Sequence, residues 1–462
     1  MRRLWIGGLT AALAIGTALF LTHVGLADPV AGTALIDLDL RSQPLGADAW
    51  LDGHQVGRTP LQLQVAPGAH SVVLKNHDVL ETPYALNADT ETGVVLNPVL
   101  WRRQATLLRL RPALPGAQLS DVRVLADGQL ALTIDLAAGH QLQAWRLEPR
   151  TGGLTQLLSD VAGVRLAVAP DASRVAYVGY DVGPAATSSI AGGALRPGMV
   201  WLAGSWSAGE RTGWRAPLAD NEHLRDASWS PLADRLLVIS DTSQPSGSLR
   251  SRLWLLDAAT LQAREILTLP SEVVPGSTLW SPDGSRVAFL AHAGLLNALC
   301  MLELDGGFRY LADLELTNGQ PLAYPAAAWS NDSQRLVFVA PRQGPPGAPI
   351  GSLQSDTKRA IYVATTTDTA PTLVGEADID GLTWREDGQL VGVSRQSTDG
   401  ALDLRVVGTS GNGIHLLDLP VQPTRGYAAA WDMAHARLLI ANSTSSGAVD
   451  YWVALLGLED NR

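Results

Sequence analysis

Cysteine and lysine are almost absent from this chain of 462 residues. Its single cysteine is Cys300, so no disulfide bond can form within the chain. Lys75 and Lys358 are its only lysines, and arginine supplies the remaining positive charge. The formal net charge is −11, and the body of the sequence contains no basic cluster. Because nucleic-acid binding needs a positive surface, we expect no nucleic-acid partner.

The familiar patterns of catalytic and metal-binding residues are also missing from the sequence. It contains no Gly-x-Ser-x-Gly nucleophile elbow and no Walker-type loop. Its nine histidines are scattered, without the spacing of metal ligands. The sequence therefore predicts no catalytic residues, no cofactor and no metal site.

The N-terminus carries an apolar segment of membrane-spanning length. Arg2 and Arg3 precede Leu4–Thr22, nineteen residues without a charge, and this length is sufficient to cross a bilayer as a helix. The two arginines favour a cytoplasmic N-terminus, with the rest of the chain outside. We expect residues 1–27 to form a single-pass anchor in the cell membrane, or a signal peptide whose cleavage near Ala27 releases a secreted protein.

One phrase of ten residues recurs through the last three quarters of the chain. In its clearest copy, Trp280–Phe289, Ser-Pro-Asp-Gly suits a type I turn and an apolar run suits a buried strand. The phrase begins with a tryptophan in five copies, which are spaced 51, 49, 55 and 47 residues apart. These tryptophans are Trp229, Trp280, Trp329, Trp384 and Trp431. A period near 50 residues without helical patterning predicts an all-β propeller.

The two ends of the repeat region supply complementary strands. The last repeat lacks a fourth strand after residues 451–456, whereas residues 104–110 form a strand that precedes the first repeat. Pairing these two segments would close the ring and remove an open sheet edge. This arrangement predicts seven blades, with six as the alternative if the weak copy near Asp127 is not a complete blade.

Residues 34–100 have the pattern of a small β module. Leu35–Leu40 alternates between apolar and polar residues, and several turn signals follow it. The segment resembles the PEGA domain, a short β-sandwich of prokaryotic envelope proteins. The matching segments are Pro44–Ala47, Leu51–Gly53, Gly57–Leu61 and Pro67–His70. The resemblance brings no catalytic residues, and it implies either an adhesive module or a spacer near the membrane.

The repeats at residues 104–462 resemble the TolB-like, WD-repeat-like β-propellers of the bacterial envelope, which share the phrase found at Trp280–Gly284. This resemblance implies a scaffold that binds other proteins or wall polymers. We expect Asp283, Asp332 and Asp387 to bond the backbone of their own turns. We expect the repeated tryptophans to pack between blades. The arginines after the turns should pair with turn acids; they are Arg174, Arg235, Arg286, Arg335 and Arg437.

The connections between second and third strands vary in length, and all of them emerge on one face of a propeller. The longest are residues 179–198, 240–251 and 340–358, which are rich in Gly, Pro and Ser. Long connections of this kind are usually functional or disordered. We therefore predict a partner-binding rim on this face. Its candidate residues are Arg196, Arg250, Arg342, Lys358 and Arg395.

Taken as a whole, the sequence predicts a non-catalytic binding or scaffold protein, anchored in the membrane and lying mostly outside the cytoplasm. Its propeller face would bind a protein or a cell-wall polymer. Two alternatives remain: a propeller enzyme of the hydrolase or lactonase type, and a structural component of a surface layer. The residues directly before the repeated tryptophans are small or apolar, which argues against a polar catalytic funnel.

Overall fold

A computed structural model describes the protein from residue 35 to residue 457, with gaps. The described residues are 35–79, 81–88, 93–98, 100–110, 117–136, 141–148, 151, 153–180, 197–204, 211–293, 296–314, 327–341, 359–368, 370–376, 381–384, 390–395, 402–407, 414–419, 428–432, 437–443 and 449–457. The expected membrane anchor at residues 1–27 lies outside them. Within these ranges, no helix has the length and apolar character needed to span a membrane.

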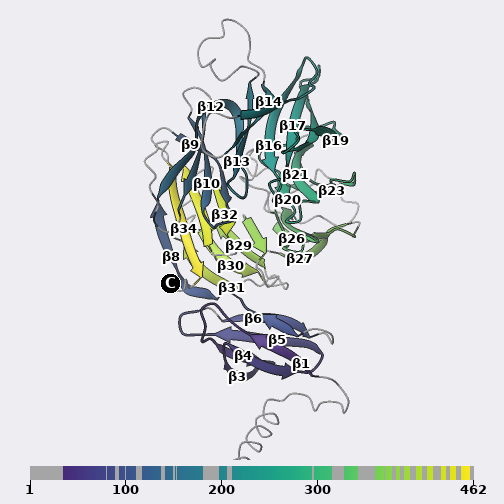
Figure 1. Cartoon of the computed structure of the whole chain (residues 1–462). Coiled ribbons are helices and arrows are strands. Elements are labelled where there is room, and N and C mark those ends of the chain that lie inside the picture. The colour runs from purple at the N-terminus through teal and green to yellow at the C-terminus, as the bar shows by residue number, and fades with distance from the viewer. Residues whose placement is uncertain are drawn as a thin grey trace, which may run out of the picture. The chain divides into compact units, whose positions relative to one another are not determined.

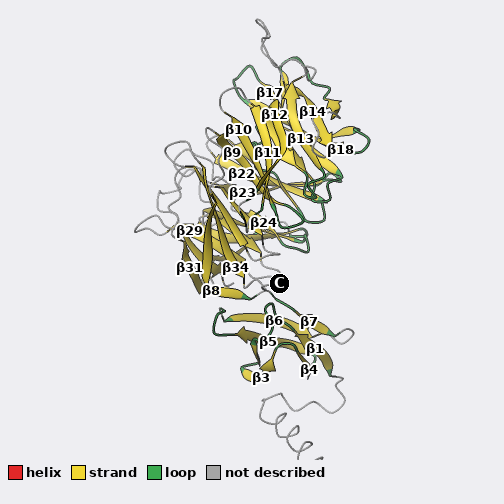
Figure 2. Ribbon diagram, turned by 60° about the vertical axis from the view of Figure 1, so that its left-hand side comes forward, coloured by secondary structure: helices red, strands yellow, loops and turns green. Residues whose placement is uncertain are grey.

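All regular structure in the described residues is β-strand, as Figure 2 shows. The chain divides into two compact units, Met1–Ala105 with Leu455–Arg462, and Thr106–Ala454. The prediction of an all-β protein is therefore confirmed for the described part of the chain.

The first unit contains two small sheets. The three-stranded sheet has the order β4 (Leu61–Val65), β1 (Ile36–Leu40) and β7 (Val94–Leu96). The four-stranded sheet has the order β3 (His54–Arg58), β2 (Asp48–Leu51), β5 (Gly68–Lys75) and β6 (Thr82–Ala88).

Apolar side chains of both sheets form the core of the first unit. In β1, Ile36, Leu38 and Leu40 are buried, and the aspartates between them point outward. They pack with residues of the second sheet, among them Leu51 and Leu74. The predicted alternation of β1 therefore decides which of its side chains enter the core.

The second unit begins with a seven-stranded sheet in the order β15 to β9. Its strands are β9 (Ala117–Val124), β10 (Leu130–Leu136), β11 (Gln141–Leu147), β12 (Leu154–Val168), β13 (Arg174–Tyr180), β14 (Pro197–Gly204) and β15 (Arg211–Arg215). The long strand β12 pairs with β11 through residues 154–162 and with β13 through residues 163–168. It therefore belongs to two successive four-stranded groups.

Four-stranded antiparallel sheets follow in sequence order. They consist of β16 (Glu222–Trp229), β17 (Arg235–Ser243), β18 (Leu249–Asp257) and β19 (Ala263–Leu269); β20 (Leu279–Trp280), β21 (Arg286–Ala293), β22 (Leu296–Glu303) and β23 (Phe308–Leu314); β24 (Ala327–Trp329), β25 (Arg335–Pro341), β26 (Arg359–Thr365) and β27 (Thr372–Glu376); and β28 (Gly381–Trp384), β29 (Leu390–Arg395), β30 (Leu402–Val407) and β31 (Ile414–Leu419). The sheet that starts at β20 has the four strands that the sequence predicts around Trp280.

The last sheet combines strands from both ends of the repeat region. It has the order β32 (Ala428–Asp432), β33 (Arg437–Ser443), β34 (Val449–Gly457) and β8 (Trp101–Leu110), with β8 beside β34 in Figure 1. The predicted pairing of the early strand with the last one is therefore confirmed. In addition, β9 of the first sheet contacts β32 and β33 of the last sheet.

The core of the second unit consists of apolar layers between successive sheets. Trp229 and Val238 of the sheet β16–β19, for example, pack against Ala176 and Val200 of the preceding strands. The next layer joins Leu237 of β17 to residues of β21 and β22. Burial of these faces drives the sheets together, and the polar groups at the two ends of the sheets remain available for other contacts.

Candidate functional site

The repeated turns lie at one end of the sheets, which we call the turn end. In the turn at Ser281–Gly284, the amide of Gly284 donates to the carbonyl of Ser281 at 2.8 Å. Gly284 has a φ of +68°, the left-handed conformation expected of a glycine there. The Asp283 carboxylate accepts hydrogen bonds from the Ser281 hydroxyl at 2.6 Å and the Ser285 amide at 2.9 Å. Partial burial raises the pKa of Asp283, but these hydrogen bonds lower it below its ordinary value.

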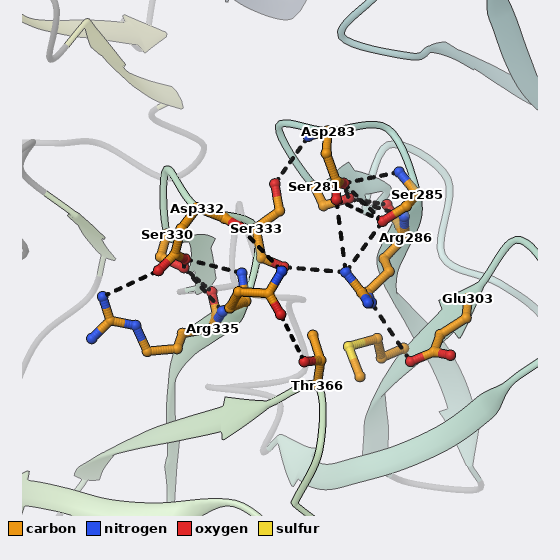
Figure 3. Close-up of polar contacts among 12 residues, drawn as sticks. Ser281, Asp283, Ser285, Arg286, Glu303, Ser330, Asp332, Ser333, Arg335 and Thr366 are labelled. Carbon is orange, nitrogen blue, oxygen red and sulfur yellow. Dashed lines mark hydrogen bonds and ion pairs between the residues drawn. The ribbon is translucent and has the colours of Figure 1, made fainter.

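Polar contacts also connect neighbouring turns, as Figure 3 shows. The amide of Asp283 donates to the Ser333 hydroxyl at 2.9 Å, and Arg286 donates to the Ser333 carbonyl at 3.3 Å. In the next turn, Asp332 accepts from the amide of Gln334 at 3.0 Å. The predicted structural role of Asp283 and Asp332 is therefore confirmed, whereas Asp387 lies outside the described residues.

The arginines after the turns stabilise the same end of the sheets. Arg286 and Arg335 each lie 3.8 Å from the aspartate of their own turn, as predicted. Arg235 lies 3.1 Å from Asp234. Arg174 differs: its guanidinium donates to the carbonyls of Ala233 and Ala258 in the next sheet. The Arg437 side chain is outside the described part of the structure. The turn end thus uses its described arginines for contacts within and between sheets.

The repeated tryptophans connect each sheet to the one before it. In four of the repeated tryptophans, the indole N–H donates to a strand of the preceding sheet, at 3.0 to 3.1 Å; the acceptor strands are β12, β16, β20 and β24. The bonds are Trp229 to the Ala167 carbonyl, Trp280 to the Ser228 hydroxyl, Trp329 to the Leu279 carbonyl and Trp384 to the Ala328 carbonyl. These contacts confirm the packing role predicted for the four tryptophans. Trp431 lies in β32, and its side chain is not described.

A cluster of charged residues lies at the opposite end of the sheets, which we call the loop end. Arg165 of β12 forms an ion pair with Asp226 of β16 at 3.0 Å. The other oxygen of Asp226 accepts a hydrogen bond from the amide of Gly276 at 2.6 Å. The Asp226 side chain is 2% exposed, so its charge is compensated by neighbours from both adjoining sheets.

Arg225 adds a second set of ion pairs to the cluster. Its guanidinium lies 3.2 Å from Asp241 of β17 and 3.3 Å from Glu272, which precedes β20. Asp241 is completely buried and also accepts a hydrogen bond from the Ser251 hydroxyl. Burial, together with the neighbouring carboxylates of Glu272 and Asp226, raises the pKa of Asp241 to about 6, against the opposing effects of Ser251 and Arg225.

The exposed members of this cluster define what it can contact. The side chains of Arg225 and His292 are 38% and 41% exposed, and that of Glu272 is 21% exposed. We call these three residues the charged rim. His292 lies near the end of β21, with its ring 4.0 Å from the Glu272 carboxylate. A partner could reach the charged rim, whereas the buried Asp226 and Asp241 hold the arginines in place.

The sequence pattern around the repeated tryptophans does not indicate the charged rim, because the two residues directly before each tryptophan are small or apolar. The charges stand further from the tryptophan: Asp226 lies three residues and Arg225 four residues before Trp229. The available signal was an Arg-Asp pair in the strand that leads to Trp229.

Of the five side chains predicted to form the partner-binding rim, the structure describes that of Arg250 alone. Arg250 is exposed at the beginning of β18, and the structure does not bring it into contact with the charged rim. Arg395 ends β29, and its side chain is not described. Arg196, Arg342 and Lys358 lie outside the described residues. In the ranges that the structure covers, no three His, Cys, Asp or Glu residues are grouped so that they could hold a metal ion.

Comparison with known proteins identifies the first unit. Residues 35–87 match the PEGA domain family. The chain carries a PEGA domain. This match confirms the resemblance seen in the sequence between Pro44 and His70. No curated protein matches the chain.

Solved structures resemble the chain mainly through its repeats. An oligogalacturonate lyase from Vibrio parahaemolyticus is 14% identical, with a TM-score of 0.50 over 76% of this chain and 97% of that one. TolB from Acinetobacter baumannii is 14% identical, with a TM-score of 0.32 over 71% and 79%. The Dos1 propeller is 13% identical, with a TM-score of 0.45 over 74% and 80%. The likeness to the lyase shows the fold alone.

Proposed function

We propose that this protein is a membrane-anchored scaffold of the prokaryotic cell envelope, whose propeller binds a protein or a wall polymer. Residues 1–27 would anchor it, and the PEGA domain and propeller would lie outside the cytoplasm. The apolar N-terminal segment after Arg2 and Arg3 supports this orientation. The PEGA match at residues 35–87 supports an envelope location, on the family resemblance described above.

We propose seven blades for the propeller. The strand β12 serves two successive four-stranded groups, which makes β9–β15 two blades. The four sheets from β16 to β31 supply four more, and β32–β34 with β8 supply the last. The contact between β9 and β32 supports closure of the ring, since these strands belong to the first and last blades.

The proposed binding surface is the loop end, and the grouping of charges from several strands there carries the proposal. Arg225 pairs with Asp241 and Glu272, and Glu272 also lies beside His292, so ion pairs fix the charged rim, which remains partly exposed. The charged groups of the repeated turns are exposed to a similar degree, but they recur from one sheet to the next. The two longest connections between described strands are residues 181–196 and 342–358, which join second to third strands at this end. Pre-positioned charged groups reduce the entropy lost on binding.

Site-specific photocrosslinking in cells tests this proposal. A photoreactive residue would replace His292 at the loop end, Ser285 at the turn end or Gln55 in the PEGA domain, all in the full chain. We expect a discrete crosslinked product from position 292 and none from position 285. Crosslinks from position 55 alone would assign binding to the PEGA domain. Crosslinks from position 285 alone would contradict the proposal.

An enzyme is the second candidate, because Asp241 has a raised pKa beside Glu272 and such pairs often mark catalytic sites. The complete burial of Asp241 weighs against direct contact with a substrate. A structural surface-layer component is the third candidate. Self-association of the full chain in detergent, measured by analytical ultracentrifugation, would favour this third candidate over binding of another molecule.

A further inference from the structure

His70 of the PEGA domain lies between two hydrogen-bond acceptors. Its Nδ1 atom is 2.8 Å from a carboxylate oxygen of Asp52, and its Nε2 atom is 2.8 Å from the carbonyl oxygen of Ala66. A carbonyl oxygen cannot donate a hydrogen bond, and neither can an ionised carboxylate. Both ring nitrogens must therefore donate, which requires two protons on the ring and a positive charge.

The same contact ties two turns of the domain together. Asp52 belongs to the turn between β2 and β3 and has a φ of +47°. Its carboxylate also accepts a hydrogen bond from the amide of Ser71 at 2.8 Å. Ala66 lies between β4 and β5, at the other side of His70. The His70 side chain is only 10% exposed, whereas that of Asp52 is 40% exposed.

We propose that the contact of His70 with Asp52 and Ala66 is a pH-sensitive element of the PEGA domain. With two protons on His70, both hydrogen bonds form. When the ring loses one proton, one nitrogen presents a lone pair to an oxygen, and that contact becomes repulsive. The domain should then loosen at the Asp52 and Ala66 turns. This proposal does not depend on the function proposed for the propeller.

The charges around His70 agree with this geometry. Burial lowers the pKa of His70, but the hydrogen bond to Asp52, the bond to Ala66 and the charge of Asp52 together raise it above its ordinary value. Burial raises the pKa of Asp52, but the contacts with His70 and Ser71 lower it below its ordinary value. His54 also faces this turn, with Nδ1 3.1 Å from the carbonyl of Asp52. Its charge further lowers the pKa of Asp52.

The direction of the pH effect follows from these shifts. His70 has a raised pKa in the folded state, so its contribution to stability is complete below about pH 6.5, the value for unfolded histidine. It is lost as the pH rises through the folded-state pKa. Asp52 has a lowered pKa, and its contribution is lost only when the pH falls through that lowered value. The contact therefore stabilises the domain between the two folded-state pKa values.

Nuclear magnetic resonance of the full chain in detergent, with isotope-labelled histidine, tests the proposal. The variant His70→Gln assigns the ring signals. We expect the titration midpoint of His70 to be higher in the folded chain than in the urea-unfolded chain, with both nitrogens protonated below it. A folded midpoint equal to or below the unfolded one would overturn the proposal.

The matched control is Asp52→Asn. The Asn amide can still accept from the Ser71 amide through its oxygen, and its NH₂ group can donate to a neutral His70 ring. We expect the His70 midpoint to shift to lower pH in this variant. An unchanged midpoint in a folded Asp52→Asn variant would also overturn the proposal. If this variant does not fold, the comparison of folded and unfolded wild-type chains still decides the question.

Discussion

Replacement of Trp229 by Phe should destabilise the propeller substantially. The Trp229 side chain is 1% exposed, and its indole N–H donates at 3.1 Å to the carbonyl of Ala167, which is 2% exposed. Phe removes the donor and leaves a buried carbonyl without this partner, at a cost of about 1–3 kcal/mol. The smaller ring also removes packing in the layer between sheets, which adds roughly 1 kcal/mol. We therefore expect a loss of about 2–4 kcal/mol in the free energy of unfolding.

The matched control for this prediction is Trp145→Phe. Trp145 is half-buried, and its indole donates to Gln143 of the same strand, so it connects no two sheets. We expect this change to cost less than about 1 kcal/mol, because water can replace a half-buried partner. Urea denaturation of the full chain, followed by circular dichroism, measures both variants. A Trp229→Phe variant as stable as the Trp145→Phe variant would refute the reasoning that the indole bonds hold the sheets together.

Two further changes test other parts of the structure. Gly163→Ala would place a Cβ atom 2.5 Å from the Val178 carbonyl oxygen, so strand β12 must shift, at a cost of about 1–3 kcal/mol. Gly204→Ala, with no atom within 4 Å, should change the melting temperature little. The pKa of Asp241 is about 6 in the folded chain and 3.8 in the unfolded chain. The free energy of unfolding should therefore fall as the pH rises from 3.8 to about 6. Asp241→Asn should lack this slope in denaturation curves recorded between pH 4 and pH 7, and a retained slope would assign it to another group.

The sequence predicts much of the architecture because the repeated signals are local. The turn at Ser281–Gly284 is set by residues that are adjacent in the chain, so its conformation can be inferred without the rest of the protein. The pairing of β8 with β34 can be predicted because the early strand has no partner within the first repeat and the last repeat lacks a fourth strand. Pairing the two removes an open sheet edge. The recurrence of Trp229 and its equivalents similarly indicates where sheets pack.

The PEGA domain shows where inference from sequence stops. Its strands and turns are visible from Pro44 to His70, because Gly and Pro mark the turns. The positive charge proposed for His70 is not visible in the same way. It depends on the distances from the ring to Asp52 and Ala66, which only the folded domain determines.

The charge cluster at the loop end was decided by tertiary structure alone. Arg165, Arg225, Asp241 and Glu272 belong to different strands and connections, and no local spacing relates them. Their ion pairs exist because antiparallel strands place the start of β16 beside the end of β17, and because successive sheets stack on each other. Local sequence determined the turns, the strands and the positions of the packing tryptophans. The long-range register of the sheets determined which charges meet, because an ion pair depends on distance in space and not on separation along the chain.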